Sequence, residues 1–428
     1  MIKATDISAE QKYSNVRKPL SEASTLPGWC YSDSRFFERE QSTIFNQCWH
    51  FVGRADEIKS VGDYLIYDSS QGSLIVMRSD SGVINAFRNA CRHRGTRLLN
   101  ETGSTQRIVC PYHSWVYGND GSLLRAPGMI ETKGFKVESC HLTAVRLESW
   151  AGFLFASYLD NGPSLSAWLG DMPEYFRRYS GAEFECVRRK KFTVRCNWKF
   201  LIENALETYH TGTVHRASLG KQLSEIIPTT GNWLCLRVFV DGKDSVSVLS
   251  SSDDSFPIYP NLEGEERTST YFTNILPCTQ FVFAPDAMWW LAINPVNADE
   301  TTLEVGSCFP TQNRMIEAFD RISKAYFDRL DMATPEDNAI CEAQHLGNLS
   351  DLGHQGRFSA EEALVHKLAN WDLDQTHRSG AKGVQITKQR NRPTGMQKDA
   401  PLAFFIMTLA NKINQPGCAF GRINRVKQ

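Results

Sequence analysis

Two short segments of this chain each pair one cysteine with one histidine. Cys91 and His93 form a Cys-x-His pair, and Cys110 and His113 form a Cys-x-x-His pair after sixteen intervening residues. Two thiolates and two imidazoles can hold a [2Fe–2S] cluster, with the cysteines on one iron and the histidines on the other. Because neutral imidazoles replace anionic thiolates, such a cluster has a higher reduction potential than an all-cysteine cluster. The pattern predicts a protein that relays single electrons.

Two other interpretations of these four residues are weaker. Zinc accepts two cysteines and two histidines, but zinc sites more usually pair Cys with Cys and His with His, whereas here each segment carries one of each. Four unrelated core residues would not normally have Gly95 and the Pro111-Tyr112 dipeptide beside them, in positions that suit turns. The spacing favours a Rieske [2Fe–2S] centre on Cys91, His93, Cys110 and His113.

A second group of potential metal ligands lies in residues 197–215. Two histidines and one carboxylate form the facial triad of non-haem Fe(II) oxygenases, which leaves coordination positions open for O₂ and substrate. His210 and His215 are five residues apart, about 140° around a regular helix, so they converge only if the backbone departs from helical geometry. Gly212 between them permits this. Alone the spacing is a weak signal, but beside an electron-relaying cluster it indicates an iron that receives the electron.

The elements that position these residues divide the chain into parts. Short alternating strands separated by turns predict an all-β domain over residues 46–160. An N-terminal segment, 1–45, precedes it and is expected to pack on the later domain, with a helix over Phe36–Phe51. The expected strands are Tyr64–Tyr67, Leu74–Met77, Val83–Phe87, Ile108–Val109 and Gly152–Ala156.

Residues 161–378 predict an α+β domain, in which helices cover an antiparallel sheet. The expected helices are Ser166–Tyr179, Trp198–Tyr209, Gln312–Leu330, Pro335–Leu346 and Ala360–Leu373. The expected strands are Phe192–Cys196, Cys235–Val240, Ser245–Leu249, Tyr271–Leu276, Gln280–Phe283, Met288–Asn294 and Thr302–Phe309.

The composition is that of an ordinary soluble protein. The 428 residues include 47 Lys and Arg against 48 Asp and Glu, so no net charge favours nucleic acid. No secretory signal is visible, and no apolar run approaches the about 20 residues of a membrane span. The cysteines outside the two ligand segments are expected to be reduced. We therefore expect a cytoplasmic protein with no membrane or nucleic-acid partner.

The C-terminal residues 379–428 form a basic extension, with nine Lys or Arg and a single acid, Asp399. Such a segment could bind a partner, an anionic surface or a neighbouring subunit. A solvated extension without a binding role is the favoured interpretation.

Taken together, the motifs resemble those of the catalytic α-subunits of Rieske non-haem iron ring-hydroxylating oxygenases. The resemblance covers about residues 36–378. It implies a Rieske domain followed by a catalytic domain of the helix-grip, START-like type. The motifs that carry it are the two Cys/His pairs, Asn197-Trp-Lys199, the segment Glu203-Asn204-x-x-Glu207-x-Tyr-His210-x-x-x-x-His215, and Glu336-Asp337 followed by Glu342.

The resemblance implies that His210, His215 and Asp337 bind a mononuclear Fe(II). The residues themselves leave the choice between Asp337 and Glu336 open. Residues 334–337 are also a good helix start, with Thr at the N-cap, Pro next and acids near the positive end of the helix dipole. Each acid shares a helical stripe with apolar residues, so this pattern does not separate them.

Glu207 lies three residues before His210, on the same side of a helix. The resemblance implies that a carboxylate here bridges the Rieske histidine of one subunit to an iron ligand of the next, and therefore a homotrimer; Asn204 is assigned to the same catalytic group. The alternative is a solvated helix glutamate. Most ring-hydroxylating members have Asp here, and Glu occurs in a branch that includes oxygenases of quaternary ammonium compounds such as carnitine.

The function that the resemblance implies is that of a Rieske mono- or dioxygenase. A reductase, with or without a ferredoxin, passes electrons from NAD(P)H to the cluster, and the cluster passes them to Fe(II). The iron then uses O₂ to hydroxylate a small substrate. A β-subunit accompanies some such chains. The favoured substrate is aromatic, as in aromatic hydrocarbon catabolism. The alternatives are hydroxylation or demethylation of a carnitine- or betaine-like quaternary ammonium compound and, more distantly, a non-catalytic electron carrier.

The substrate pocket is expected to be apolar with a few polar groups. Arg216 or Lys221 would be the cationic partner of an acid-bearing aromatic substrate. Trp289 and Trp290 suit an aromatic cage for a quaternary ammonium, but neighbours on a strand face opposite ways, so only one of them can line the pocket. The expected lining residues are Leu201, Leu206, Val214, Leu219, Phe281, Phe283, Trp290, Ile293 and Phe319.

Overall fold

The structure is a computed structural model, which describes residues 7, 9–179, 183–239, 246–249, 255–350 and 353–377. The predicted basic extension, 379–428, lies outside these described residues. Of the strand predicted at Ser245–Leu249, residues 246–249 are described and form bends rather than a strand.

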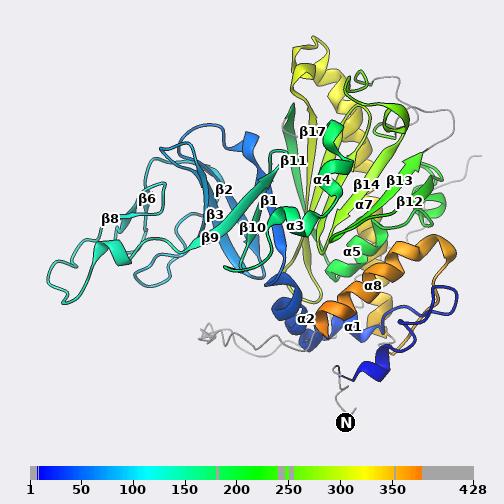
Figure 1. The fold of residues 1–428 in the computed structure, drawn as a ribbon, viewed down its shortest axis with the longest axis horizontal. Helices are drawn as coiled ribbons and strands as arrows, with labels where there is room; N and C mark the ends of the chain where they lie inside the picture. The colour runs from blue at the N-terminus through cyan, green and yellow to red at the C-terminus, as the bar shows by residue number, and fades with distance from the viewer. Residues whose placement is uncertain are drawn as a thin grey trace, which may run out of the picture. The chain divides into compact units, whose positions relative to one another are not determined.

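Residues 49–157 contain strands and no α-helix, in agreement with the predicted all-β domain (Figure 1). A seven-stranded antiparallel sheet has the order β1-β10-β9-β4-β3-β2-β5, and a small sheet has the order β6-β7-β8. The strands are β1 Trp49–Arg54, β2 Asp63–Ser69, β3 Gly72–Arg78, β4 Ile84–Arg88, β5 Gly103–Ser104, β6 Ile108–Val109, β7 Val116–Tyr117, β8 Leu123–Arg125, β9 Ala144–Trp150 and β10 Phe153–Ser157.

Strand β3 is buried on both sides, and its side chains alternate between two hydrophobic clusters. Ile75 and Met77 pack in the cluster that contains Cys91 and Cys110. Leu74 and Val76 of the same strand, with Leu65 and Leu154, belong to the other cluster. The sheet thus supports the segments that carry the predicted ligands with one of its faces.

The second half contains a seven-stranded antiparallel sheet with the order β11-β17-β16-β15-β14-β13-β12. Its strands are β11 Phe184–Val194, β12 Leu223–Ile227, β13 Trp233–Phe239, β14 Thr270–Ile275, β15 Thr279–Phe283, β16 Met288–Pro295 and β17 Thr301–Pro310. The helices of the chain are α1 Trp29–Ser32, α2 Ser34–Glu40, α3 Leu165–Leu169, α4 Met172–Tyr175, α5 Trp198–Asn204, α6 Thr211–Val214, α7 Phe319–Ser350 and α8 Ala363–Thr376.

The two faces of this sheet have different partners. One face packs against α5, α7 and α8 in the largest hydrophobic cluster, to which Trp289 belongs. The other face packs against β1, β10, α3 and α4, and there Trp290 lies with Phe51 and Phe281. This confirms the α+β architecture of a sheet covered by helices. The exact domain boundaries, 46–160 and 161–378, stay predictions.

The helix predicted over Trp198–Tyr209 was too long, since α5 ends at Asn204. The carbonyl of Ala205 accepts hydrogen bonds from the side-chain amides of Asn274 and Gln280 on the sheet. That carbonyl is not available to continue the helical ladder, so tertiary contacts set the end of α5. The chain beyond Ala205 runs as turns, and the helical angle between Glu207 and His210 does not apply.

Two other predicted helices are interrupted in the structure. Residues 36–51 do not form one helix: α2 is followed by a π-turn over Gln41–Phe45, and Trp49 begins β1. The predicted helix 166–179 is interrupted at Gly170, whose φ of 61° is not helical. Only glycine fits this position, because a side chain would collide with the carbonyl of Thr230.

The helices predicted over Gln312–Leu330 and Pro335–Leu346 are replaced by the single helix α7, with Pro335 inside it. Proline removes one backbone hydrogen bond from a helix interior, and α7 continues through this defect. Thr334 is therefore no N-cap, and capping does not explain the acids at 336 and 337.

The N-terminal segment is attached to α5 by buried polar groups. Glu40 and Lys199 are both fully buried and form an ion pair, and Trp198 Nε1 donates to Glu40 at 3.1 Å. The Tyr31 hydroxyl donates to Glu203 Oε1 at 2.8 Å. Charges as deeply buried as these stabilise a structure only when they are paired.

Lys199→Met is expected to destabilise the protein by roughly 3–5 kcal/mol, because it leaves the Glu40 carboxylate buried without a counter-ion. Urea denaturation followed by circular dichroism measures the free energy of unfolding. Lys324→Met is the matched control, since the Lys324–Asp328 pair is exposed and contributes little. Equal effects of the two variants would contradict this role of the buried pair.

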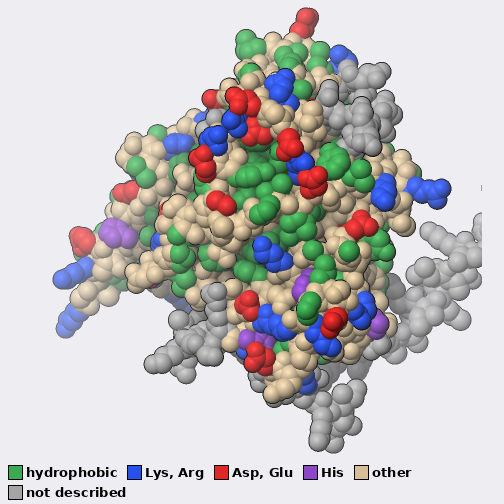
Figure 2. All heavy atoms as spheres, turned by 45° about the vertical axis from the view of Figure 1, so that its right-hand side comes forward, with side chains coloured by type: hydrophobic (Ala, Val, Ile, Leu, Met, Phe, Trp, Pro, Cys, Tyr) green, Lys and Arg blue, Asp and Glu red, His purple; other side chains and the backbone are tan. Residues whose placement is uncertain are grey.

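On the face shown in Figure 2, hydrophobic side chains gather in a central area, and charged side chains of both signs lie around it. Among the described helices, none combines the length and apolarity needed to cross a membrane.

Candidate metal centres

The four predicted cluster ligands lie on two loops with the same backbone hydrogen bonds. In each loop the cysteine N–H donates to the carbonyl five residues on, and the residue four positions on donates to the cysteine carbonyl. That fourth residue has a positive φ in both loops, 75° at Gly95 and 57° at Ser114. The loops that begin at Cys91 and Cys110 therefore repeat one conformation.

The side chains of these loops converge. Cys91 and Cys110 are buried, and the ring centroids of His93 and His113 lie 4.7 Å apart. The buried Nδ1 of His113 has no hydrogen-bond partner among the described residues. Two buried thiols, two neighbouring imidazoles and an unpaired ring nitrogen fit a mixed Cys/His cluster.

Tyr117 is placed to adjust the reduction potential of such a cluster. Its hydroxyl lies 3.2 Å from Cys91 Sγ, and it accepts a hydrogen bond from the Arg92 N–H. A donor to a thiolate stabilises the more negative, reduced state and so raises the potential.

Tyr117→Phe is expected to lower the cluster potential. A difference of about 1 kcal/mol between the redox states corresponds to roughly 40 mV for one electron. A spectroscopic redox titration measures this shift. Tyr64→Phe, which removes a hydroxyl near Gly103 in the same core, is the control. An unchanged potential in Tyr117→Phe would show that this hydroxyl does not act on the cluster.

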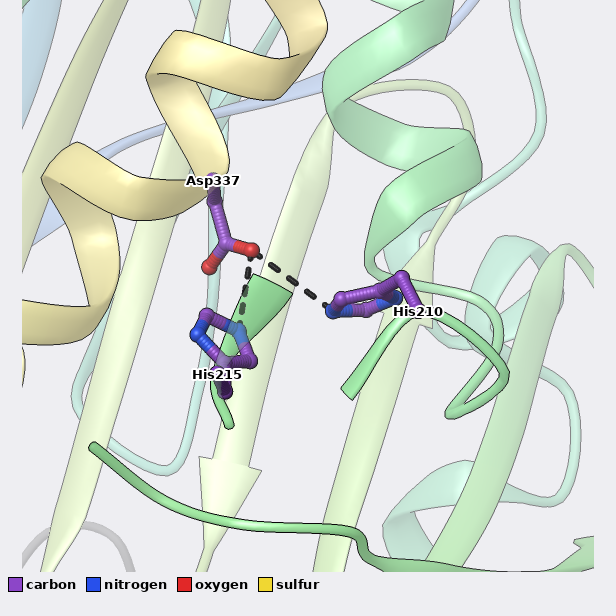
Figure 3. Close-up of side chains that lie close together, drawn as sticks. All are labelled: His210, His215 and Asp337. Carbon is purple, nitrogen blue, oxygen red and sulfur yellow. Dashed lines mark ion pairs between the residues drawn. The ribbon is translucent and has the colours of Figure 1, made fainter. Parts of the chain in front are cut away.

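The structure brings His210, His215 and Asp337 together (Figure 3). One ligand atom of each residue lies within 4.8 Å of the others. Asp337 Oδ1 is 3.0 Å from His215 Nε2 and 3.6 Å from His210 Nε2. This oxygen is buried without a hydrogen bond of good geometry. Two imidazole nitrogens and one carboxylate oxygen around a common point fit the two-histidine, one-carboxylate type of iron site.

Each of the two histidines also contacts a second carboxylate through its other ring nitrogen. Glu207 Oε1 is 2.7 Å from His210 Nδ1, and Glu336 Oε2 is 2.7 Å from His215 Nδ1. Ser218 Oγ donates to the same Glu336 oxygen at 2.6 Å. A carboxylate on Nδ1 fixes the tautomer that leaves Nε2 free for a metal. The geometry thus separates the two acids that the sequence left open: Asp337 faces both Nε2 atoms, and Glu336 orients one ring.

The backbone that brings the histidines together is a single helical turn. His210 is the N-cap of α6 and His215 is its C-cap, and the two ring centroids lie 5.2 Å apart. Gly212 lies inside α6 with an ordinary φ, so the convergence comes from the ends of a short helix and not from a distortion at glycine. Burial alone would lower the pKa of His215, but hydrogen bonds and charges from Asp337 and Glu336 outweigh burial and raise it.

A cavity of about 90 Å³ adjoins the three residues. The sheet contributes Leu236, Phe272, Trp289 and Leu291 to its wall, and α7 contributes Arg329. This cavity is smaller than the apolar cavity of about 150 Å³ that accommodates benzene. Asn204, Glu207, His210, His215 and Asp337 also line it.

Of the nine lining residues predicted, Leu201, Leu219 and Ile293 line this cavity. Trp289 lines it instead of Trp290, because the strand register turns Trp290 to the opposite face. The predicted cations are exposed and lie outside the lining, whereas the buried Arg329, which the sequence analysis missed, lies inside it. The predicted residues that do not line it are Leu206, Val214, Phe281, Phe283, Trp290 and Phe319, and the cations outside it are Arg216 and Lys221.

Two family models match the chain at the two candidate centres. Residues 48–136 match the Rieske [2Fe–2S] domain, and residues 181–377 match the ring hydroxylating alpha subunit (catalytic domain). The chain belongs to the Rieske non-haem iron oxygenases. The predicted family and its cofactors, a Rieske cluster and a mononuclear iron, are confirmed.

Three relatives of this Rieske oxygenase have assigned activities. The N,N-dimethyl phenylurea N-demethylase subunit alpha of Sphingobium sp. (strain YBL2) is 38% identical over 199 residues, 44% of this chain. The glycine betaine monooxygenase oxygenase subunit of Chromohalobacter salexigens is 37% identical over 192 residues, 45% of this chain. Both alignments span 43% of the relative, less than half its length. The carnitine monooxygenase oxygenase subunit of Escherichia coli (strain K12) is 29% identical over 80% of this chain and 89% of its own.

Solved structures confirm the fold of this Rieske oxygenase. A quaternary ammonium Rieske monooxygenase superposes with a TM-score of 0.72 at 24% identity, covering 86% of this chain and 98% of the other. Naphthalene 1,2-dioxygenase from Rhodococcus sp. also gives 0.72, at 19% identity, covering 87% and 100%. Because the two scores are equal, the fold does not choose between the substrate classes.

Proposed function

We propose that this chain is the oxygenase component of a system that oxidises a small N-methylated ammonium compound. The observation that carries the proposal is the alignment with carnitine monooxygenase over most of both chains. The two other relatives are named for glycine betaine and for an N,N-dimethyl phenylurea, and both of these compounds carry N-methyl groups. Glutamate at position 207 agrees with this class. The aromatic substrate that the sequence analysis favoured has less support.

The overall reaction for such a substrate balances with one O₂ and one NAD(P)H. One oxygen atom is inserted into a C–H bond next to nitrogen. The other oxygen atom is reduced to water by two electrons from NAD(P)H and two protons. Where the oxidised carbon is an N-methyl group, the N–CH₂OH product releases formaldehyde and the demethylated amine. NAD(P)H as electron source leads us to place the system in the cytoplasm, with a reductase as partner.

We assign the iron ligands from the geometry of the site. His210 Nε2, His215 Nε2 and Asp337 would hold the mononuclear Fe(II), and Cys91, His93, Cys110 and His113 would hold the cluster. The bound iron supplies O₂ activation. Glu207 and Glu336 hold the two rings in the tautomer that faces the metal, and the apolar wall around Phe272 and Leu291 excludes water from the substrate.

Glu207 is proposed as the residue through which electrons enter from a neighbouring subunit. It lines the substrate cavity and also a second cavity of about 310 Å³ next to Tyr31, Ile340 and Glu362. His210 lines both cavities as well. A head-to-tail ring lets every subunit donate and receive electrons, and we propose a homotrimer.

A substrate panel tests the proposed function. The purified protein with a reductase would be supplied with glycine betaine, carnitine, an N,N-dimethyl phenylurea, benzoate and naphthalene. We expect NADH oxidation, O₂ uptake and product to be coupled one to one with at least one N-methyl compound. Tight coupling with benzoate or naphthalene and none with the N-methyl compounds would overturn the proposal.

A further inference from the structure

Arg329 is a buried cation inside the substrate cavity. It projects from α7 and is only 4% exposed. Its Nε donates to the carbonyl of Val246 at 2.6 Å, and its guanidinium carbon lies 4.8 Å from the centre of the Trp289 ring. The carbonyl and the ring fix the plane of the guanidinium group, and no residue that the structure describes hydrogen-bonds to its two terminal nitrogens.

This arginine differs from the other buried cations of the protein. Lys199 is paired with Glu40, and Arg54 is paired with Asp56. Within the described residues, no carboxylate lies within ion-pair distance of Arg329. Burial lowers its pKa to about 10, and Asp337 partly opposes this. The group is still protonated at neutral pH, so among the described residues Arg329 is a buried charge without a direct ion pair, which is unfavourable unless a ligand supplies one.

We propose that Arg329 binds the carboxylate group of the substrate. A guanidinium with two free terminal nitrogens matches a carboxylate with two parallel hydrogen bonds. Arg329 is eight residues before Asp337 on the same helix, about 12 Å along its axis. An anionic group would be held at the Arg329 end of the cavity while the rest of the molecule reaches the histidines.

This inference rests on the proposed function and narrows it. The substrate is then a zwitterion with an N-methylated cation and a carboxylate, and not a neutral urea or a hydrocarbon. Arg329 lines the same cavity as the candidate iron ligands, so one small molecule could contact both. It also relocates the anion-binding cation, which the sequence analysis placed at Arg216 or Lys221.

Matched ligands test the inference by direct binding. Glycine betaine and choline share a trimethylammonium group, and only glycine betaine carries a carboxylate; benzoate and benzyl alcohol form a second such pair. Calorimetry on the iron-loaded protein measures both Kd values of each pair. We expect the wild-type protein to prefer glycine betaine to choline by about 10- to 100-fold, as a charge-assisted pair predicts. In Arg329→Gln that ratio should fall to near one. In turnover of glycine betaine, KM should rise by a larger factor than kcat falls.

Two further variants keep the test decisive. Arg329→Lys retains the charge without the planar fork and should give an intermediate ratio, which also serves if Arg329→Gln does not fold. Arg216→Gln removes an exposed arginine beside His215 and should keep the wild-type ratio.

The outcomes distinguish the inference from the proposed function. Equal binding of glycine betaine and choline by the wild-type protein, together with equal binding of benzoate and benzyl alcohol, would overturn the role of Arg329. A ratio that collapses in Arg216→Gln and persists in Arg329→Gln would also overturn it. Selective, Arg329-dependent binding of benzoate without turnover of any N-methyl compound would uphold Arg329 and overturn the proposed function.

Discussion

Asp337→Ala is expected to remove one iron per chain and to abolish product formation, while the EPR signal of the reduced cluster remains. Asp337 Oδ1 faces the Nε2 atoms of both His210 and His215, so no other described oxygen replaces it as the third ligand. Losing this oxygen should lower iron affinity by roughly 100-fold or more. Replacing a residue that only hydrogen-bonds to a metal ligand already lowers metal affinity by about 10- to 100-fold. Iron analysis, EPR and product assays measure the three effects separately.

Glu336→Ala is the matched control for this experiment. Glu336 contacts Nδ1 of His215 and so acts through the ring and not on the metal. We expect iron affinity to weaken by about 10- to 100-fold and activity to return at high Fe(II) concentration. Loss of the iron from Glu336→Ala but not from Asp337→Ala would show that the ligand assignment is wrong by one residue.

Glu207→Ala is expected to keep both metal centres filled at saturating Fe(II) and to block electron transfer between them. The carboxylate is 2.7 Å from His210 Nδ1 and faces the second cavity, where a neighbouring subunit would approach. Stopped-flow spectroscopy of the pre-reduced protein with substrate and O₂ follows reoxidation of the cluster, which should slow by roughly 100-fold or more, the size of effect expected when a buried charge-assisted contact is lost.

Glu336→Gln controls for any general effect of an acid next to an iron ligand, because it touches the other histidine. Its cluster should reoxidise at close to the wild-type rate when iron is saturating. Sedimentation velocity gives the oligomeric state. A monomer with full activity would contradict the bridge and the ring together.

The sequence predicted the chemistry better than the helices. Cysteines and histidines at short, fixed spacings specify a cluster through local loops. The four ligands Cys91, His93, Cys110 and His113 could therefore be predicted without knowledge of the tertiary structure. The end of α5 could not be predicted, because the side-chain amides that donate to the Ala205 carbonyl belong to Asn274 and Gln280, far along the chain. Pro335 was expected to begin a helix, but packing of α7 on both sides of it outweighs one lost hydrogen bond.

The three side chains that the structure brings together were predicted from the sequence, but most of the residues around them were missed. His210, His215 and Asp337 follow a family motif, whereas Arg329 belongs to no local pattern and is identified only by its burial in the cavity. The one available signal is that it precedes Asp337 by about two helical turns. For the tryptophans, strand alternation showed that only one of the two can face the pocket, but the predicted choice of Trp290 was wrong, because Trp289 lines the cavity.

That alternation on β16 has a consequence for how new specificities arise. Trp289, Leu291 and Ile293 face the substrate, while Trp290 and Ala292 between them face the packed strands of the first half of the chain. Substitutions at odd positions can therefore change which molecules are accepted without disturbing the contact at even positions. The cavity face of β16 can therefore change between related enzymes while the opposite face keeps its packing contacts. A single substitution on the cavity face could then alter the substrate that is accepted.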